Sequence, residues 1–209
     1  MSSSGPSTSS SSTRSGGEPS FSPHPPHLTY PGWVQSLARR IRALEPSCGP
    51  VRLVAVDGPA GSGKTTYADR LAAALGCQVV HSDDFPVPWE EGPGPWFAAL
   101  EESVLRPLAA GRPGAYRRYD WARGAYAETV TVPVAPALVI EGVGTARRSA
   151  ARLIAFTVWV EAPPDVRLRR VLRRDGPGLE QAWHAWFKAE QAWFAEDGTR
   201  ERADLVHRT

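Results

Sequence analysis

The chain is predicted to fold as an α/β three-layer sandwich, with a mostly parallel sheet flanked by helices. Short apolar runs typical of buried strands alternate with longer segments of helical periodicity, and this alternation is typical of parallel sheets covered on both faces. The chain has 209 residues, of which 42% are hydrophobic, so it can build one sizeable core. We therefore expect one folded domain over residues 32–209.

The first 31 residues differ in composition from the rest. Ser, Pro and Gly dominate this segment and aliphatic side chains are almost absent. Such a segment cannot bury enough apolar surface to offset the entropy lost on ordering, so we predict a disordered tail over residues 1–31. A transit peptide is rejected because Arg14 is the sole arginine of the tail and no amphipathic period is present.

The order of elements follows from apolar spacing and from the positions of Gly and Pro. Strands are predicted at residues 51–57, 78–81, 116–121, 129–132, 137–140, 153–160 and 203–207. Helices are predicted at residues 33–44, 67–75, 96–110, 164–174 and 179–195. The first of these helices is expected to cover the sheet. The loop 86–95 is rich in Pro and Gly and is expected to carry substrate contacts.

One segment fits a phosphate-binding pattern in full. It follows a predicted strand, precedes a predicted helix and matches G-x-x-x-x-G-K-[ST], which would occur by chance in under roughly 1% of chains this long. Its residues are Gly58, Pro59, Ala60, Gly61, Ser62, Gly63, Lys64 and Thr65, followed by Thr66. In a fold of the P-loop NTPase type, such a loop binds the phosphates of ATP through backbone N–H groups and the helix N-terminus. We expect Lys64 to reach the β- and γ-phosphates and Thr65 to ligate Mg²⁺.

Acidic residues come directly after predicted strands, where functional groups of open α/β sheets gather. They are Asp57, the pair Asp83 and Asp84, and Glu141. Phosphoryl transfer to a hydroxyl needs Mg²⁺ near the phosphates and a carboxylate that accepts the hydroxyl proton. Asp83 and Glu141 are placed to supply both, with Asp83 also beside the metal. The alternatives are a turn or helix cap for the Asp pair and a solvated strand end for Glu141.

The predicted helix 164–174 is dense in arginine. Arg167, Arg170 and Arg174 recur at intervals of three and four and share one face, and Arg169 and Arg173 form a neighbouring row. We interpret this face as a lid that closes over the triphosphate and neutralises charge during transfer. A solvated basic surface is the alternative.

Aromatic residues gather in two further places. Those of helix 179–195 follow helical spacing and are interpreted as packing against the sheet, and the lone residues His81 and His184 are given no metal role. Tyr119, Trp121 and Arg123 form a polar-aromatic patch that could stack on and hydrogen-bond a flat or sugar-bearing acceptor.

Composition excludes several other classes of protein. The formal charge of +2 gives no indication of a nucleic-acid partner, and no apolar run approaches the roughly 20 residues that span a bilayer. The two cysteines have no metal-like spacing and their low number fits a reducing compartment. We expect a cytoplasmic protein that acts on a small-molecule acceptor, without nucleic acid or membrane. No pattern fixes its oligomeric state.

Taken together, these motifs resemble the uridine kinase family, which is grouped with phosphoribulokinase. The likeness covers residues 51–207 in order and spacing, through the phosphate loop, Ser82–Phe85, Tyr119–Trp121, 128–132, 140–142, 165–175 and 203–204. The resemblance implies that Asp83 is the general base, that Glu141 supports Mg²⁺, and that Arg167, Arg170 and Arg174 are lid and phosphate residues.

The same resemblance places the acceptor beside Asp84, Tyr119, Asp120 and Arg123, with Tyr119 lining a nucleoside pocket. This half of the chain departs from the family. The histidine that reads the base is absent from residues 122–125, Pro86 replaces an aromatic residue, and the later helix has residues 183–185 where a glutamine is expected.

The expected activity is transfer of the γ-phosphate of ATP to a hydroxyl of a small molecule, and a nucleoside is the first acceptor expected. Two alternatives stay open. One is a nucleotide-binding regulatory module that transfers no phosphate. The other is a nucleoside monophosphate kinase, for which Arg117, Arg118 and Arg123 would bind the second phosphate. No base-reading motif distinguishes ATP from GTP as donor.

Overall fold

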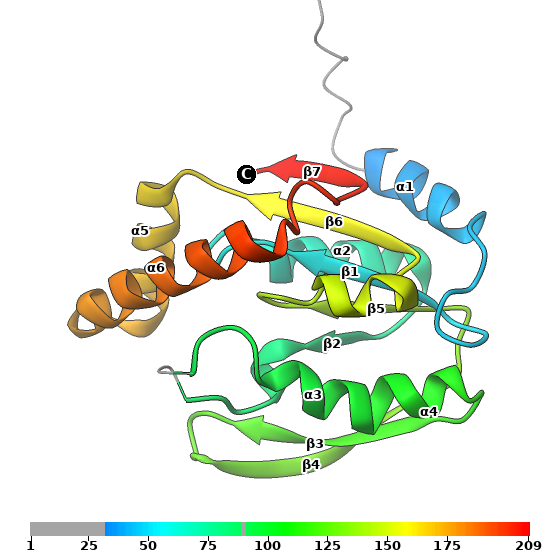
Figure 1. Ribbon diagram of the computed structural model, residues 1–209. Coiled ribbons are helices and arrows are strands. Elements are labelled where there is room, and N and C mark those ends of the chain that lie inside the picture. The colour runs from blue at the N-terminus through cyan, green and yellow to red at the C-terminus, as the bar shows by residue number, and fades with distance from the viewer. Residues whose placement is uncertain (1–31, 89–90) are drawn as a thin grey trace, which may run out of the picture.

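A computed structural model describes residues 32–88 and 91–209 (Figure 1). The predicted disordered tail, residues 1–31, lies outside the described residues. Five strands form one parallel sheet in the order β2-β5-β1-β6-β7. Their bounds are β1 Arg52–Asp57, β2 Val79–His81, β5 Ala137–Glu141, β6 Phe156–Glu161 and β7 Leu205–Arg208. The predicted three-layer α/β sandwich is confirmed.

The central strand β1 is buried on both faces, which explains its continuous apolar sequence. Its side chains alternate, so that Leu53 and Ala55 belong to one core cluster and Val54 and Val56 to the other. Because neighbouring strands are in parallel register, their carboxyl ends meet at one edge of the sheet. The phosphate loop, the turn with Asp83, and Glu141 follow strands at this edge.

Helices α1 (Gly32–Arg42) and α2 (Lys64–Leu75) cover the face that carries Val54 and Val56. Leu37, Ala38 and Ile41 of α1 are buried there. The expectation that the first helix covers the sheet is therefore confirmed. The phosphate loop leads directly into α2, whose first residue is Lys64.

The opposite face is covered by one interrupted helix and a hairpin. The predicted helix 96–110 consists of α3 (Trp96–Leu100), a π-helical turn η3 (Glu101–Leu105) and α4 (Arg106–Ala109). Pro107 has no backbone N–H and cannot continue a regular α-helical ladder, which accounts for the irregular turn before it. The hairpin is antiparallel and consists of β3 (Gly114–Asp120) and β4 (Ala125–Val132), so its second strand begins four residues before the predicted one.

The C-terminal third carries helices α5 (Pro164–Asp175) and α6 (Glu180–Asp197), with the 3-10 turn η5 (Pro177–Leu179) between them. Residues Arg148–Leu153 form the 3-10 turn η4, so β6 begins three residues later than predicted. Phe194 of α6 packs edge-on against Trp159 of β6, with ring centroids 4.6 Å apart. The predicted packing of the aromatic helix against the sheet is seen for Phe194, whereas Phe187 and Trp183 lie against Arg167 and Arg174 of α5.

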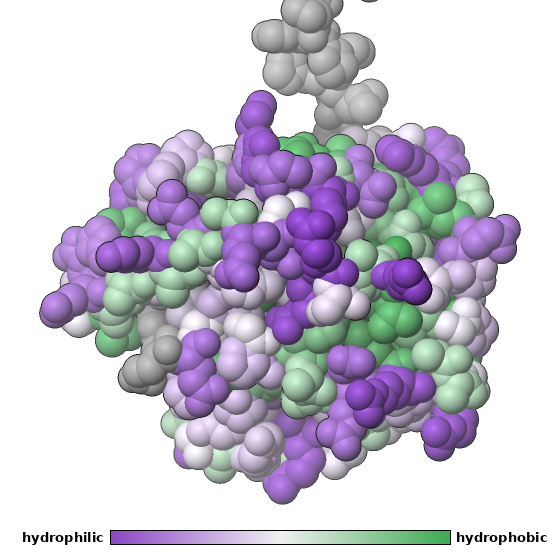
Figure 2. All heavy atoms as spheres, in the orientation of Figure 1, coloured by the Kyte–Doolittle hydropathy of each residue, from purple (hydrophilic) through white to green (hydrophobic). Residues whose placement is uncertain are grey.

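Hydrophilic side chains are spread over the face shown in Figure 2, with apolar residues between them. No helix in the described part of the chain is both long and apolar enough to cross a membrane.

Candidate active site

The phosphate loop lies between the end of β1 and the start of α2, and its glycines Gly58, Gly61 and Gly63 all have positive φ. Gly58 has φ +138°, and a Cβ there would lie 2.1 Å from the carbonyl oxygen of Val160. Gly63 has φ +94° and caps α2 in a left-handed conformation. Side chains would be strained at Gly58 and Gly63, so glycine is required at these two positions of the motif.

Lys64 is buried, with 7% of its surface exposed, and its Nζ donates to the Pro59 carbonyl oxygen at 3.2 Å. Within residues 32–88 and 91–209, no carboxylate lies within 4.0 Å of this ammonium. A buried cation with a single carbonyl acceptor is the arrangement that a bound anion would complete. The cradle therefore fits a nucleotide phosphate.

Glu141 stands at the end of β5, opposite His81 of β2 in the parallel register, and is 6% exposed. Its Oε2 accepts a hydrogen bond from the Thr65 hydroxyl at 3.3 Å and lies 3.0 Å from Nδ1 of His81. The hydrogen bond to Glu141 raises the pKa of His81. The predicted metal residues Thr65 and Glu141 are thus brought together, and His81 orients the carboxylate.

This pair fits Mg²⁺ on the chemistry of its donors. No group of three or more His, Cys, Asp and Glu side chains in the described chain is arranged as a metal site. Mg²⁺ needs none, because it prefers one or two carboxylates together with phosphate and water oxygens. A hydroxyl and a carboxylate beside a phosphate cradle supply such a set.

Asp83 lies in the 3-10 turn η1 (Ser82–Asp84) that follows β2. It is exposed to solvent and lies near enough to Glu141, Lys64 and Arg174 to feel their charges. Partial burial and the negative charge of Glu141 raise its pKa, while Lys64 and Arg174 oppose the shift. Its backbone carbonyl accepts a hydrogen bond from Trp121 Nε1 at 2.6 Å. The hairpin therefore contacts the predicted base directly.

Asp84 has a different setting from Asp83. Its Oδ2 accepts a hydrogen bond from the Tyr116 hydroxyl at 2.5 Å, and Tyr116 stacks on Phe85 with ring centroids 4.8 Å apart. Tyr116 also lines a cavity of about 650 Å³ whose walls include Phe85, Val87, Trp96, Arg117 and Tyr126. Asp84 thus connects the turn that carries the predicted base with an aromatic cavity under the Pro-rich loop.

The remaining predicted acceptor residues lie at the tip of the hairpin. Tyr119 packs edge-on against Trp121 and Tyr126, at 5.0 and 5.5 Å between ring centroids. Asp120 accepts the backbone N–H of Arg123 at 3.1 Å and pairs with its guanidinium at 3.5 Å. Asp120 and Arg123 therefore close the hairpin turn, while Trp121, which packs against Tyr119, contacts Asp83.

The three arginines of α5 have unequal settings. Arg170 donates to the Gly61 carbonyl oxygen at 3.2 Å and to the Thr209 hydroxyl at 2.9 Å. Arg174 is held by Asp175 at 2.7 and 2.9 Å and lies near enough to Asp83 and Glu141 to act on both charges. Arg167 instead pairs with Glu190 of α6. The predicted face does approach the phosphate loop, but its first arginine is engaged by a buried carboxylate.

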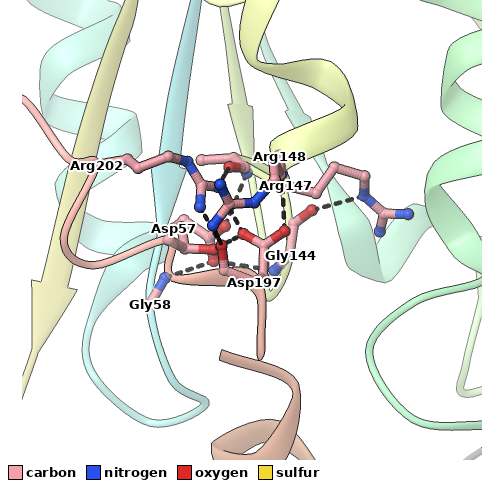
Figure 3. A network of polar contacts seen from close by, with 9 residues as sticks. Asp57, Gly58, Gly144, Arg147, Arg148, Asp197 and Arg202 are labelled. Atoms are coloured by element: carbon pink, nitrogen blue, oxygen red, sulfur yellow. Dashed lines mark hydrogen bonds and ion pairs between the residues drawn. The ribbon is translucent and has the colours of Figure 1, made fainter. Parts of the chain in front are cut away.

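Sequence reasoning assigned no role to Asp57 beyond its place at a strand end. It is fully buried and its two oxygens accept the backbone N–H groups of Gly58, Gly144 and Ala146 at 2.7, 2.9 and 2.8 Å (Figure 3). Burial raises its pKa to about 6, against the effect of these three donors and of Lys64. Asp57 ties the first turn of the phosphate loop to the segment after Glu141.

Arg147 was also missed, because nothing in its sequence position indicates a contact. It donates to the carbonyl oxygens of Gly144 at 3.1 Å and Gly94 at 2.8 Å, and its guanidinium lies 4.2 Å from the ring centroid of Phe97. It therefore fixes the Pro-rich loop to the same segment that Asp57 holds.

Comparisons with known proteins identify structures with a similar fold. No curated protein sequence matches the chain. A solved structure of a possible uridine kinase from Bacillus stearothermophilus superposes with a TM-score of 0.64 at 23% identity, over 83% of this chain and 96% of that one. A candidate fructose transport system kinase from Silicibacter sp. TM1040 gives 0.57 at 22% identity, over 83% and 98%.

These likenesses establish that the chain shares its fold with both of these structures. A family profile described as an AAA domain matches residues 53–196, which include the phosphate loop, the turn after β2, the end of β5 and both C-terminal helices. The chain therefore belongs to this AAA domain family of P-loop proteins.

Proposed function

We propose that the protein is a Mg²⁺- and ATP-dependent phosphotransferase that moves the γ-phosphate to a hydroxyl of a small molecule, with a nucleoside as the preferred class of acceptor. One observation carries the proposal: a complete phosphate loop, the Thr65–Glu141 pair and Asp83 meet at one edge of the sheet. Phosphoryl transfer depends on positioning and on charge stabilisation, and this arrangement offers both.

On the donor side, backbone N–H groups of the phosphate loop and the buried ammonium of Lys64 would bind the triphosphate. Thr65 and Glu141 would hold Mg²⁺, which when bound neutralises charge on the phosphates. Arg170 and Arg174 present their guanidinium groups from α5 toward the loop and the carboxylates. These contacts would leave the γ-phosphate facing Asp83.

On the acceptor side, Asp83 would orient the hydroxyl and accept its proton. Burial and Glu141 raise the pKa of Asp83, which makes this carboxylate a stronger base than one in water. Trp121 fixes the backbone of this turn through its bond to the Asp83 carbonyl oxygen. The base is thereby held by the element that carries Tyr119, so acceptor and base would be positioned together.

The charges around the hairpin support an acceptor without a phosphate group. Arg118 pairs with Glu128 at 2.8 Å and Arg123 pairs with Asp120 at 3.5 Å, while Arg117 lies over the ring of Tyr126 at 5.2 Å. A nucleoside monophosphate needs a cluster of available cations, and two of the three candidates are neutralised by carboxylates. The aromatic residues favour an acceptor with a flat ring.

A coupled ADP-release assay tests the proposal. Mg²⁺-ATP is offered with a panel of nucleosides, pantothenate, sugars and nucleoside monophosphates. We expect ADP release to be stimulated at least tenfold by a nucleoside and not by a monophosphate. Stimulation by another hydroxyl compound would reassign the acceptor. ATP binding without stimulation by any member of the panel would contradict the proposed transfer and favour a nucleotide-binding module.

A further inference from the structure

Helix α6 brings a buried carboxylate to the phosphate loop. Glu190 is 1% exposed, and its Oε2 accepts the backbone N–H of Ala60 at 2.8 Å across 130 residues of sequence. Neither the aromatic spacing of α6 nor the phosphate-loop motif accounts for an acid at this position. A carboxylate is an unexpected neighbour for a loop that binds anions, so its contacts need an explanation.

The same carboxylate holds Arg167. Oε1 of Glu190 pairs with Nη1 of Arg167, whose side chain is 11% exposed, and this guanidinium donates to the carbonyl oxygen of Ala60 at 3.3 Å. The guanidinium also lies 4.4 Å from the ring centroid of Phe187 on α6. Glu190 and Arg167 therefore hold both the N–H and the C=O of one loop residue.

The neighbouring residue is restrained from the same side. A Cβ on Gly61 would lie 2.7 Å from the Arg167 carbonyl oxygen, so α5 packs directly on the loop. A buried ion pair that makes further hydrogen bonds to the same backbone residue favours one geometry and resists rearrangement. Arg167 is thus fixed against the loop by contacts from two helices, whereas a mobile lid residue would be exposed.

We propose that Glu190 is a positioning residue of the phosphate loop. Its carboxylate, together with Arg167, holds Ala60 in place so that the loop keeps its binding shape before a nucleotide arrives. Arg167 then belongs to this clamp, and Arg170 and Arg174 are the arginines of α5 that face the phosphates. Preorganisation of this kind lowers the cost of binding, because the loop need not be ordered by the ligand. The inference rests on the proposed function only in taking the ligand to be a nucleoside triphosphate.

A positioning role and a simple charge effect predict opposite results. If Glu190 were only a negative charge near the phosphates, its removal would relieve repulsion and tighten nucleotide binding. If it positions the loop, its removal frees Ala60 and weakens binding. The variant Glu190→Gln removes the charge and keeps the size of the side chain. Glu196→Gln, on the exposed side of the same helix, is the matched control.

Two measurements on the full chain separate these cases. Hydrogen exchange of a peptide covering residues 57–63, without nucleotide, reports on the Ala60 amide. Isothermal titration with Mg²⁺ and AMP-PNP, a non-hydrolysable ATP analogue, reports the Kd. For Glu190→Gln we expect at least tenfold faster exchange in this peptide and at least a tenfold higher Kd. Glu196→Gln should match the wild type in both.

A folding defect would not hide the answer. If Glu190→Gln does not fold, as judged by its thermal melt, the double variant Glu190→Leu with Arg167→Met leaves no buried charge unpaired and should show the same two changes. Unchanged exchange in whichever variant folds, or a lower Kd, would overturn the proposal. If the wild type binds no nucleotide, the proposed function fails, while the exchange rates still decide whether the clamp exists.

Discussion

Glu161, the last residue of β6, offers a quantitative test of how the sheet edge beside the phosphate loop is held together. Its carboxylate accepts hydrogen bonds from Arg200 at 2.8 Å, Arg208 at 2.9 Å and Trp159 Nε1 at 2.9 Å. It therefore links β6 to β7 and to the segment after α6. The bonds from Arg200 and Arg208 lower the pKa of Glu161 to about 2, below its ordinary value of 4.5.

The size of this contribution to stability follows from the pKa difference. A gap of about 2.5 pKa values corresponds to roughly 3 kcal/mol of free energy of unfolding. That figure is an upper limit, because the side chains of Arg200 and Arg208 are 44% and 79% exposed and water screens their charges. We expect a contribution of about 1–2 kcal/mol at neutral pH.

The way this contribution to stability changes with pH follows from the lowered pKa of Glu161 in the folded state. The contribution is complete above pH 4.5 and is lost as the pH falls toward 2. Urea unfolding of Glu161→Gln and the wild type, with exposed Glu45→Gln as control, measures it at several pH values. The free-energy difference of about 1–2 kcal/mol at pH 7 should fall to less than about half by pH 3. A difference that stays constant from pH 7 to pH 3 would refute this reasoning.

Three further substitutions test the donor site and the core. Gly58→Ala should lower the free energy of unfolding, measured in urea, by about 2–4 kcal/mol, because its Cβ would lie 2.1 Å from the Val160 carbonyl oxygen. Retention of full stability would contradict the loop geometry. Lys64→Ala should raise the Kd for AMP-PNP in the presence of Mg²⁺, measured by isothermal titration, by at least about tenfold. An unchanged Kd would contradict the role of Lys64 in phosphate binding. Ile140→Ala, fully buried in β5, should lower the free energy of unfolding by about 2–5 kcal/mol; a loss under about 1 kcal/mol would show that this strand is not central.

Much of the fold could be predicted because its signals are local. The apolar run of β5, the glycine loop and the amphipathic period of α1 lie within single segments of sequence. The errors arose where tertiary contacts override local pattern. The strand β4 extends to Ala125 because its first residues pair with the aromatic end of β3, and the helix after the Pro-rich loop contains a π-helical turn before Pro107.

The site could be predicted only in part, for the same reason. Asp83, Glu141 and Lys64 could be predicted as candidates because each stands beside a strand end or within a motif. The contact of Glu190 with Ala60 joins residues 130 positions apart, and the contacts of Asp57 with Gly144 and Ala146 span 87 and 89. No spacing rule connects such residues. The catalytic and acceptor roles assigned to the site residues stay predictions.

Direct transfer of the γ-phosphate tests the central claim. The enzyme is incubated with γ-labelled ATP, Mg²⁺ and the acceptor that best stimulates ADP release, and labelled products are separated for the wild type, Asp83→Asn and the surface control Asp165→Asn. We expect one labelled acceptor per ADP in the wild type and the control. In Asp83→Asn we expect a loss of about 10²-fold or more, with AMP-PNP affinity within about threefold. Label found only in inorganic phosphate, or full transfer by Asp83→Asn, would contradict the account.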